Sequence, residues 1–193
     1  MSGNNIVGDY YISGVRQGFL YDGSSYTTLN PTGASGGTFC WAMGVSGSNV
    51  VGSYYAHGFL YDASSSSYTI LDVPGASWTG ATGVDGNSVV GFYDDSSGGR
   101  HGFLYDVSSS SYTILDAPEA VIRGTAATGV SGNNIVGDYY SDRWHGFLYD
   151  GSSYTTLNPP ESPPPPIPEP ASVVCGLIGL GMIGRYIKKH RSA

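Results

Sequence analysis

The chain has 193 residues, a length that suits one domain with a buried core. Its 30 glycines, 16 tyrosines and charged fraction of only 12% are typical of short strands joined by many turns. Residues 1–170 carry all 15 acidic residues and only four of the eight basic ones. This acidic body repels phosphate backbones, so we expect no nucleic-acid partner.

The N-terminus begins directly inside a repeated segment. SGNNIVGDYY follows Met1 and is identical to residues 131–140, whereas a secretory signal would need a basic start and an apolar run of about 7–15 residues. A short segment of the type Ala-Thr-Gly-Val precedes this point in the later copies but not in the first. We therefore expect this reading frame to start within a repeat and the first copy to lack one strand.

Four copies of one unit fill residues 1–158. They begin with the segments Ser2–Asn30, Ser46–Asp72, Asp85–Asp116 and Ser131–Asn158. The glycine of the block Gln/His-Gly-Phe-Leu-Tyr-Asp recurs at spacings of 40, 44 and 44 residues, at Gly18, Gly58, Gly102 and Gly146. A period of about 40–50 residues indicates propeller blades or another repeat array. The predicted units are 2–45, 46–84, 85–130 and 131–158.

Each unit contains four predicted strands separated by Gly, Asn and Ser turns. In the fourth unit these strands are Ala126–Val130, Asn134–Tyr140, His145–Asp150 and Tyr154–Asn158. Adjacent strand residues point to opposite faces, so the neighbours Ile135 and Val136 place apolar groups on both faces of the sheet. Sheets covered on both sides favour an all-β, propeller-like array with an incomplete first blade. A linear stack of small sheets satisfies the same pattern.

The repeats end in a proline spacer and an apolar segment. Residues 159–170 (PPESPPPPIPEP) predict an extended polyproline linker. Residues 171–184 carry no charge, and counting on to Ile187 with a snorkelling Arg185 gives a short transmembrane helix within residues 171–193. Basic residues that follow the apolar run are typical of the cytoplasmic side of a membrane.

The order of these C-terminal elements resembles a PEP-CTERM sorting tail. The resemblance covers residues 167–193 and implies that Pro168, Glu169 and Pro170 form the recognition motif of an exosortase-type membrane processing enzyme. It also implies that the helix is a temporary membrane stop, closed by a basic cluster of Arg185, Lys188, Lys189 and Arg191. The protein would then be exported, held transiently in the inner membrane, and delivered to the cell surface or the extracellular space.

The body of the chain is similar to the extracellular repeats called HAF type, through its recurring His-Gly-Phe-Leu-Tyr-Asp and Asn-x-(Ile/Val)-Val-Gly blocks. Gln17 replaces the histidine in the first copy. The two resemblances together imply a protein of the exopolysaccharide or biofilm matrix.

Repeated histidines and aspartates are the residues that could bind a metal ion. His57, His101 and His145 share one repeat position and suggest a metal, but a strand-entry histidine with a local hydrogen bond is the favoured interpretation. The aspartate that ends each Phe-Leu-Tyr-Asp block favours turn formation. Calcium at Asp94, Asp95 and Asp142 lacks the Asp-x-Asp-x-Asp-Gly spacing. We therefore predict no metal and no cofactor.

Paired tyrosines recur on the second strand of three units. One member of each pair is a candidate for stacking on sugars. The alternative is that tyrosine simply suits a half-buried sheet. The candidate stacking residues are Tyr10, Tyr54 and Tyr139.

Catalysis finds no support in the sequence, which lacks Gly-x-Ser-x-Gly and any Cys–His constellation. Nearly interchangeable repeats also offer little of the asymmetry that an active site needs. The first hypothesis is a non-enzymatic structural or adhesive module. Two alternatives stay open: a glycan-binding module for exopolysaccharide and a metal-dependent hydrolase.

Overall fold

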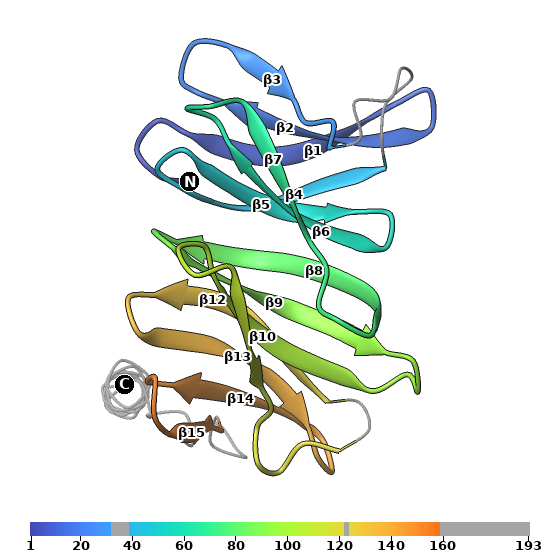
Figure 1. Cartoon of the computed structure of the whole chain (residues 1–193), viewed down its shortest axis with the longest axis vertical. Helices are drawn as coiled ribbons and strands as arrows, with labels where there is room; N and C mark the ends of the chain where they lie inside the picture. Colours follow the sequence, from blue (N-terminus) through green and yellow to red (C-terminus); the bar gives the residue numbers. More distant parts are fainter. Residues whose placement is uncertain (32–38, 122–123, 159–193) are drawn as a thin grey trace, which may run out of the picture. The chain divides into compact units, whose positions relative to one another are not determined.

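Fifteen strands and no helix make up the part of the chain that the computed structural model describes, namely residues 1–31, 39–121 and 124–158. They form four antiparallel sheets, each of which follows the chain order of its strands (Figure 1). The all-β class predicted from the sequence is therefore confirmed. Residues Met1–Asn158 form one compact unit.

The first sheet has three strands and each later sheet has four. The first sheet contains β1 (Ile6–Ile12), β2 (Val15–Tyr21) and β3 (Tyr26–Thr28). The second contains β4 (Cys40–Ser46), β5 (Asn49–Tyr54), β6 (His57–Asp62) and β7 (Ser67–Leu71). The third contains β8 (Ala76–Asp85), β9 (Ser88–Asp95), β10 (Arg100–Asp106) and β11 (Ser111–Leu115). The fourth contains β12 (Thr125–Ser131), β13 (Asn134–Tyr140), β14 (Trp144–Tyr149) and β15 (Tyr154–Leu157). The strand missing from the first unit was thus correctly predicted.

Every sheet has one face rich in aromatic residues and one face rich in aliphatic residues. In the second sheet, Val50, Tyr61 and Tyr68 lie opposite one another across three strands and belong to what we call the aromatic face. Their neighbours Val51 and Leu60 belong to the aliphatic face. This alternation follows from the period of two in a strand.

The aliphatic face of one sheet packs on the aromatic face of the next, and this contact occurs three times. Between the second and third sheets, Val51, Leu60 and Leu71 share a buried cluster with Phe103 and Tyr105. Matching clusters join the first sheet to the second and the third to the fourth. Full burial of one such side chain is worth roughly 1.5–3 kcal/mol. Apolar groups on both strand faces are therefore explained by sheet-on-sheet packing.

The first strands of successive four-stranded sheets approach one another closely. Each of these strands carries a β-bulge, placed in β8 between Ala81 and Gly83. A Cβ atom at Gly83 would lie only 3.2 Å from the Cα atom of Gly129 in the next sheet. Thr82 donates its hydroxyl to the carbonyl of Ala127 at 2.7 Å. Glycine at these positions therefore suits the close spacing of neighbouring sheets.

The described sheets do not close into a ring. β4 packs on β1 and β2, β8 packs on β4, β5 and β6, and β12 packs on β8, β9 and β10. No substantial contact joins the first sheet to the fourth within the described residues. The arrangement is the open series of sheets that the sequence allowed as the alternative to closure.

Candidate functional site

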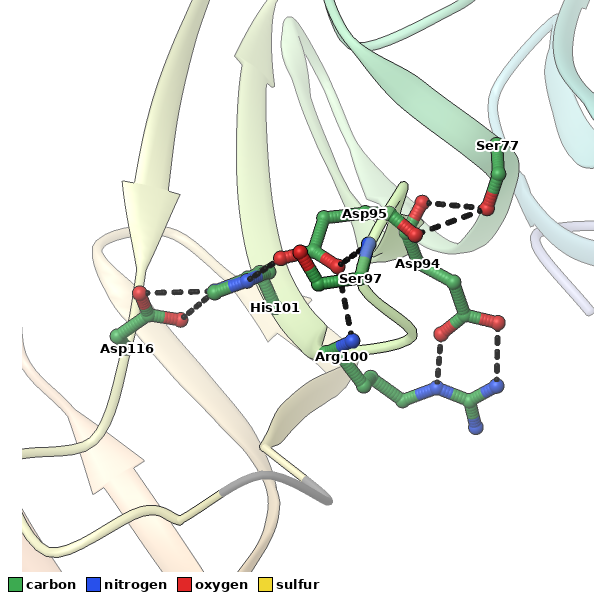
Figure 2. Close-up of polar contacts among 8 residues, drawn as sticks. Ser77, Asp94, Asp95, Ser97, Arg100, His101 and Asp116 are labelled. Carbon is green, nitrogen blue, oxygen red and sulfur yellow. Dashed lines mark hydrogen bonds and ion pairs between the residues drawn. The ribbon is translucent and has the colours of Figure 1, made fainter.

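A group of five charged or titratable side chains lies at one end of the third sheet. Asp94 and Asp95 end β9, Arg100 and His101 begin β10, and Asp116 follows β11. Antiparallel pairing brings these three strand ends together, with His101 opposite Tyr93 in the register. Figure 2 shows two groups at this end of the sheet, His101 between Asp116 and Asp95, and Arg100 paired with Asp94. We call these five residues the third-sheet cluster.

Arg100 is held on two sides. Its Nε and Nη2 atoms donate to the two carboxylate oxygens of Asp94 at 2.8 and 3.0 Å, a bidentate geometry. Its guanidinium carbon lies 4.1 Å from the centroid of the Phe92 ring, a cation–π contact. The arginine is thus occupied by groups of its own sheet.

His101 lies between two carboxylates. Its Nδ1 atom is 3.0 Å from both oxygens of Asp116, and its Nε2 atom is 3.3 Å from Asp95 (Figure 2). The imidazole also stacks on Tyr93 with ring centroids 5.0 Å apart. Partial burial lowers the pKa of His101, but the hydrogen bonds and charges of Asp116 and Asp95 outweigh it and raise that pKa above its ordinary value.

Asp95 has its own structural partners. It accepts hydrogen bonds from the backbone N–H groups of Ser97 and Gly99 at 2.7 and 2.9 Å. These bonds, and then His101, lower the pKa of Asp95. The carboxylate therefore closes the hairpin between β9 and β10.

A pocket of about 490 Å³ borders the cluster, and its lining includes the polar residues Asp95, Arg100, His101 and Asp116 and the apolar residues Ala117, Ala120 and Val121. Its polar groups are the ones already engaged with one another. The two carboxylates that contact His101 approach opposite edges of the imidazole, so the three groups do not converge on one point. Among the residues described, no group of three or more His, Cys, Asp or Glu side chains could hold a metal ion.

The other repeats place the same histidine in the same local role. His57 contacts Asp72 at 2.9 and 3.0 Å. His145 contacts Asn158 at 2.7 Å and Asp142 at 2.9 Å. In the first sheet, Gln17 accepts from the hydroxyl of Tyr10 at 2.8 Å. Each histidine is therefore bonded within its own sheet, as the strand-entry interpretation expects.

The repeated aspartate of the Phe-Leu-Tyr-Asp block closes the following turn in every unit. Asp62 accepts from the backbone and hydroxyl of Ser64 at 2.9 and 2.7 Å and from the hydroxyl of Ser65 at 2.8 Å. These bonds lower the pKa of Asp62 to about 2. The pKa values of Asp22, Asp106 and Asp150 are lowered by equivalent bonds.

The tyrosines named for sugar stacking occupy unlike environments. Tyr54 and Tyr139 are buried in the contacts between sheets, because they lie on aromatic faces covered by the preceding sheet. Tyr10 is partly exposed, because no sheet of the described chain covers the aromatic face of the first sheet.

An open apolar pocket on the first sheet was not found from the sequence. It measures about 360 Å³ and is lined by Tyr10, Phe19, Tyr26 and Thr28. Within the described residues, no sheet covers the aromatic residues that line it.

The predicted sorting motif Pro168, Glu169 and Pro170, the helix within 171–193 and its basic cluster all lie outside the described residues. Within the described residues, no helix has the length and apolar character needed to cross a membrane. Cys40 is buried, and this burial raises the pKa of its thiol to about 11.

No family model matches this chain, and no match was found among curated proteins.

Proposed function

We propose that this chain is an exported repeat protein with a structural or adhesive role at the cell surface or in an exopolysaccharide matrix, and that its body is not an enzyme. One observation carries the proposal: the side chains that recur in every unit are engaged in building the sheets. The repeated Phe of the second to fourth sheets and the repeated Leu of the first to third sheets lie between sheets. The repeated Asp closes a turn, and the His present in three units bonds within its sheet. Such residues support a scaffold.

The finer architecture we propose is a propeller-like array whose first blade is incomplete. The regular aliphatic-on-aromatic packing and the close approach of Gly83 to Gly129 support this view, since both repeat from sheet to sheet. Closure of the array would need further blades, because the described sheets form an open series.

The proposed route of the chain depends on its C-terminal segment. Pro168, Glu169 and Pro170 would be recognised by an exosortase-type enzyme after the apolar segment has entered the inner membrane. The basic cluster would hold the segment there until processing releases the body to the surface. The resemblance of residues 167–193 to a sorting tail supports this route.

The test is complementation of a strain that lacks the protein, with the full chain expressed behind an export signal. Matrix cohesion and processing of the chain are measured. A variant with Pro168, Glu169 and Pro170 replaced by Ala should remain unprocessed and fail to restore cohesion. The variant His101→Asn should restore it. Normal processing of the first variant would refute the export route, and loss of cohesion with folded His101→Asn would refute the scaffold role.

A second candidate is glycan binding, favoured by the open pocket of Tyr10, Phe19 and Tyr26. Aromatic faces suit the apolar faces of sugars, and Tyr26 is the most exposed of the three. In a pull-down with purified exopolysaccharide, Tyr26→Ala should reduce retention at least several-fold. The matched control is Tyr55→Ala, because Tyr55 is also exposed but lies outside the pocket. Equal retention of both variants and wild type would dismiss this candidate.

A further inference from the structure

The two outer faces of the series of sheets are exposed where their counterparts are buried. On the aromatic face of the first sheet, Ile6 is 42% and Tyr26 is 72% exposed. On the aliphatic face of the fourth sheet, Val136 is 42% and Leu157 is 47% exposed. The counterparts of Leu157 in the other units are at most 2% exposed, namely Leu29, Leu71 and Leu115.

The two outer faces have the same unlike compositions, one aliphatic and one aromatic, as the faces that pack together inside the chain. An aliphatic face meets an aromatic face at each of the three internal contacts. The face left over on the fourth sheet is aliphatic, with Val136, Leu148 and Leu157. The face left over on the first sheet is aromatic, with Tyr10, Phe19 and Tyr26. The contact surface that the chain forms three times internally is therefore available once more at its ends.

Polar contacts between turns also repeat from sheet to sheet, and within the described residues this series stops at the first and fourth sheets. The backbone N–H of Gly47 donates to the hydroxyl of Ser2 at 3.0 Å, and that of Gly86 donates to Ser46 at 3.4 Å. The side-chain amide of Asn5 donates to the carbonyl of Gly47 at 2.8 Å. Each bond joins the first turn of one unit to the same turn of the next.

The end residues of this series have the matching geometry. Gly3 has a φ of 57°, the same as Gly47. Its backbone therefore has the same turn conformation as Gly47, which bonds to Ser2 and Asn5 of the preceding unit. Ser131 and Asn134 occupy the positions of Ser2 and Asn5 in the fourth unit, and both are exposed.

We propose that the aliphatic face of the fourth sheet binds the aromatic face of the first sheet on a second copy of this chain. In this contact the hydroxyl of Ser131 accepts from the N–H of Gly3, and the amide of Asn134 donates to the carbonyl of Gly3. The two faces differ, so the contact is heterologous and each copy can extend the series at both ends. The inference does not depend on the export route.

The contact between copies is weaker than the internal contacts. The first sheet lacks the strand that corresponds to β4, β8 and β12, and these strands supply much of each internal contact. Less apolar area is therefore removed from water, and association should depend on concentration in the micromolar range or above.

The test is sedimentation velocity of the full chain over a range of concentrations. Tyr26→Arg places a charge on the aromatic face, and Leu157→Arg places one on the aliphatic face. The matched control is Ile114→Arg, because Ile114 is 44% exposed but lies on an internal sheet. Circular dichroism checks that each variant is folded.

The expected result is specific to a contact between unlike faces. Wild type and Ile114→Arg should form dimers and longer species as concentration rises, whereas Tyr26→Arg alone and Leu157→Arg alone should each stay monomeric. An equimolar mixture of these two variants should form a dimer and nothing larger, because each keeps one intact face. A monomeric wild type, dimerisation of either variant alone, or association of a chain that carries both substitutions would overturn the proposal.

Discussion

At the scale of single residues, the aspartates that close the turns are the most regular feature of the chain. Each accepts several hydrogen bonds from the residues two and three positions after it. Bonds of this kind favour the ionised carboxylate, which explains the low pKa values. The ionised form therefore stabilises the fold above the unfolded pKa of about 3.9 and ceases to do so as pH falls through the folded value.

Asp62→Ala should lower the melting temperature at pH 7, since it removes the acceptor for Ser64 and Ser65. The difference from wild type should shrink as the pH falls toward about 2, where Asp62 is protonated. The melting temperature of Asp62→Asn, which keeps one acceptor oxygen, should lie between those of wild type and Asp62→Ala. Thermal unfolding followed by circular dichroism at several pH values measures this. A difference that is constant between pH 2 and 7 would contradict the assignment.

For His101 the predicted dependence of stability on pH has the opposite direction. Its raised pKa means that its contribution to stability is complete below the unfolded pKa of about 6.5 and is lost as pH rises through the folded value. The NMR titration midpoint of His101 should therefore lie above 6.5, and Asp116→Asn should lower it. A midpoint at or below 6.5 in wild type would show that burial outweighs the two carboxylates.

The sequence predicts residue roles only where local geometry decides them. The turn aspartates were correctly assigned, because the acceptor and its donors lie within three residues. For Tyr54 and Tyr139 the sequence left sugar stacking open beside the favoured interpretation of a half-buried sheet, since the side of the strand that meets another sheet depends on packing between units. Sequence spacing alone shows that two adjacent tyrosines face opposite sides and does not show which side is covered.

At the scale of elements, the same repeat position contributes differently to the free energy of unfolding in different sheets. Phe103 on the third sheet is fully buried against the second sheet, whereas Phe19 on the first sheet lines the open pocket. Phe103→Ala should cost about 3–5 kcal/mol of unfolding free energy, because it leaves a cavity. Phe19→Ala should cost less than about 2 kcal/mol. Urea denaturation measures both, and equal losses would mean that the first sheet is covered.

The strands themselves were largely predictable. Turn signals such as Ser-Gly-Asn and Asp-Gly-Ser-Ser bound them, and the missing strand of the first unit left a visible gap in the repeat. The bulge in the first strand of each four-stranded sheet was not predicted. In β8 it lies where neighbouring sheets approach each other at Gly83 and Gly129, a contact 46 residues apart by sequence number that no local pattern encodes.

At the scale of the whole molecule, the repeat pattern fixes how one sheet meets the next and leaves the number of sheets open. Apolar residues on both faces of a strand require covering sheets on both sides. A closed ring and an open series fulfil this requirement equally well in the interior and differ only at the two ends. This is why the sequence identified the sheets but favoured closure, whereas the described residues form an open series.

Hydrogen exchange of the monomeric chain, followed by mass spectrometry, tests this open series most directly. Protection depends on burial of the sheet, so amides in β5, β6, β9 and β10 should exchange slowest, because their sheets are covered on both faces. Amides in β1, β2, β14 and β15 should exchange faster. Protection of β1 and β2 equal to that of β5 and β6 would mean that the aromatic face of the first sheet is covered within one chain, and would contradict the open series.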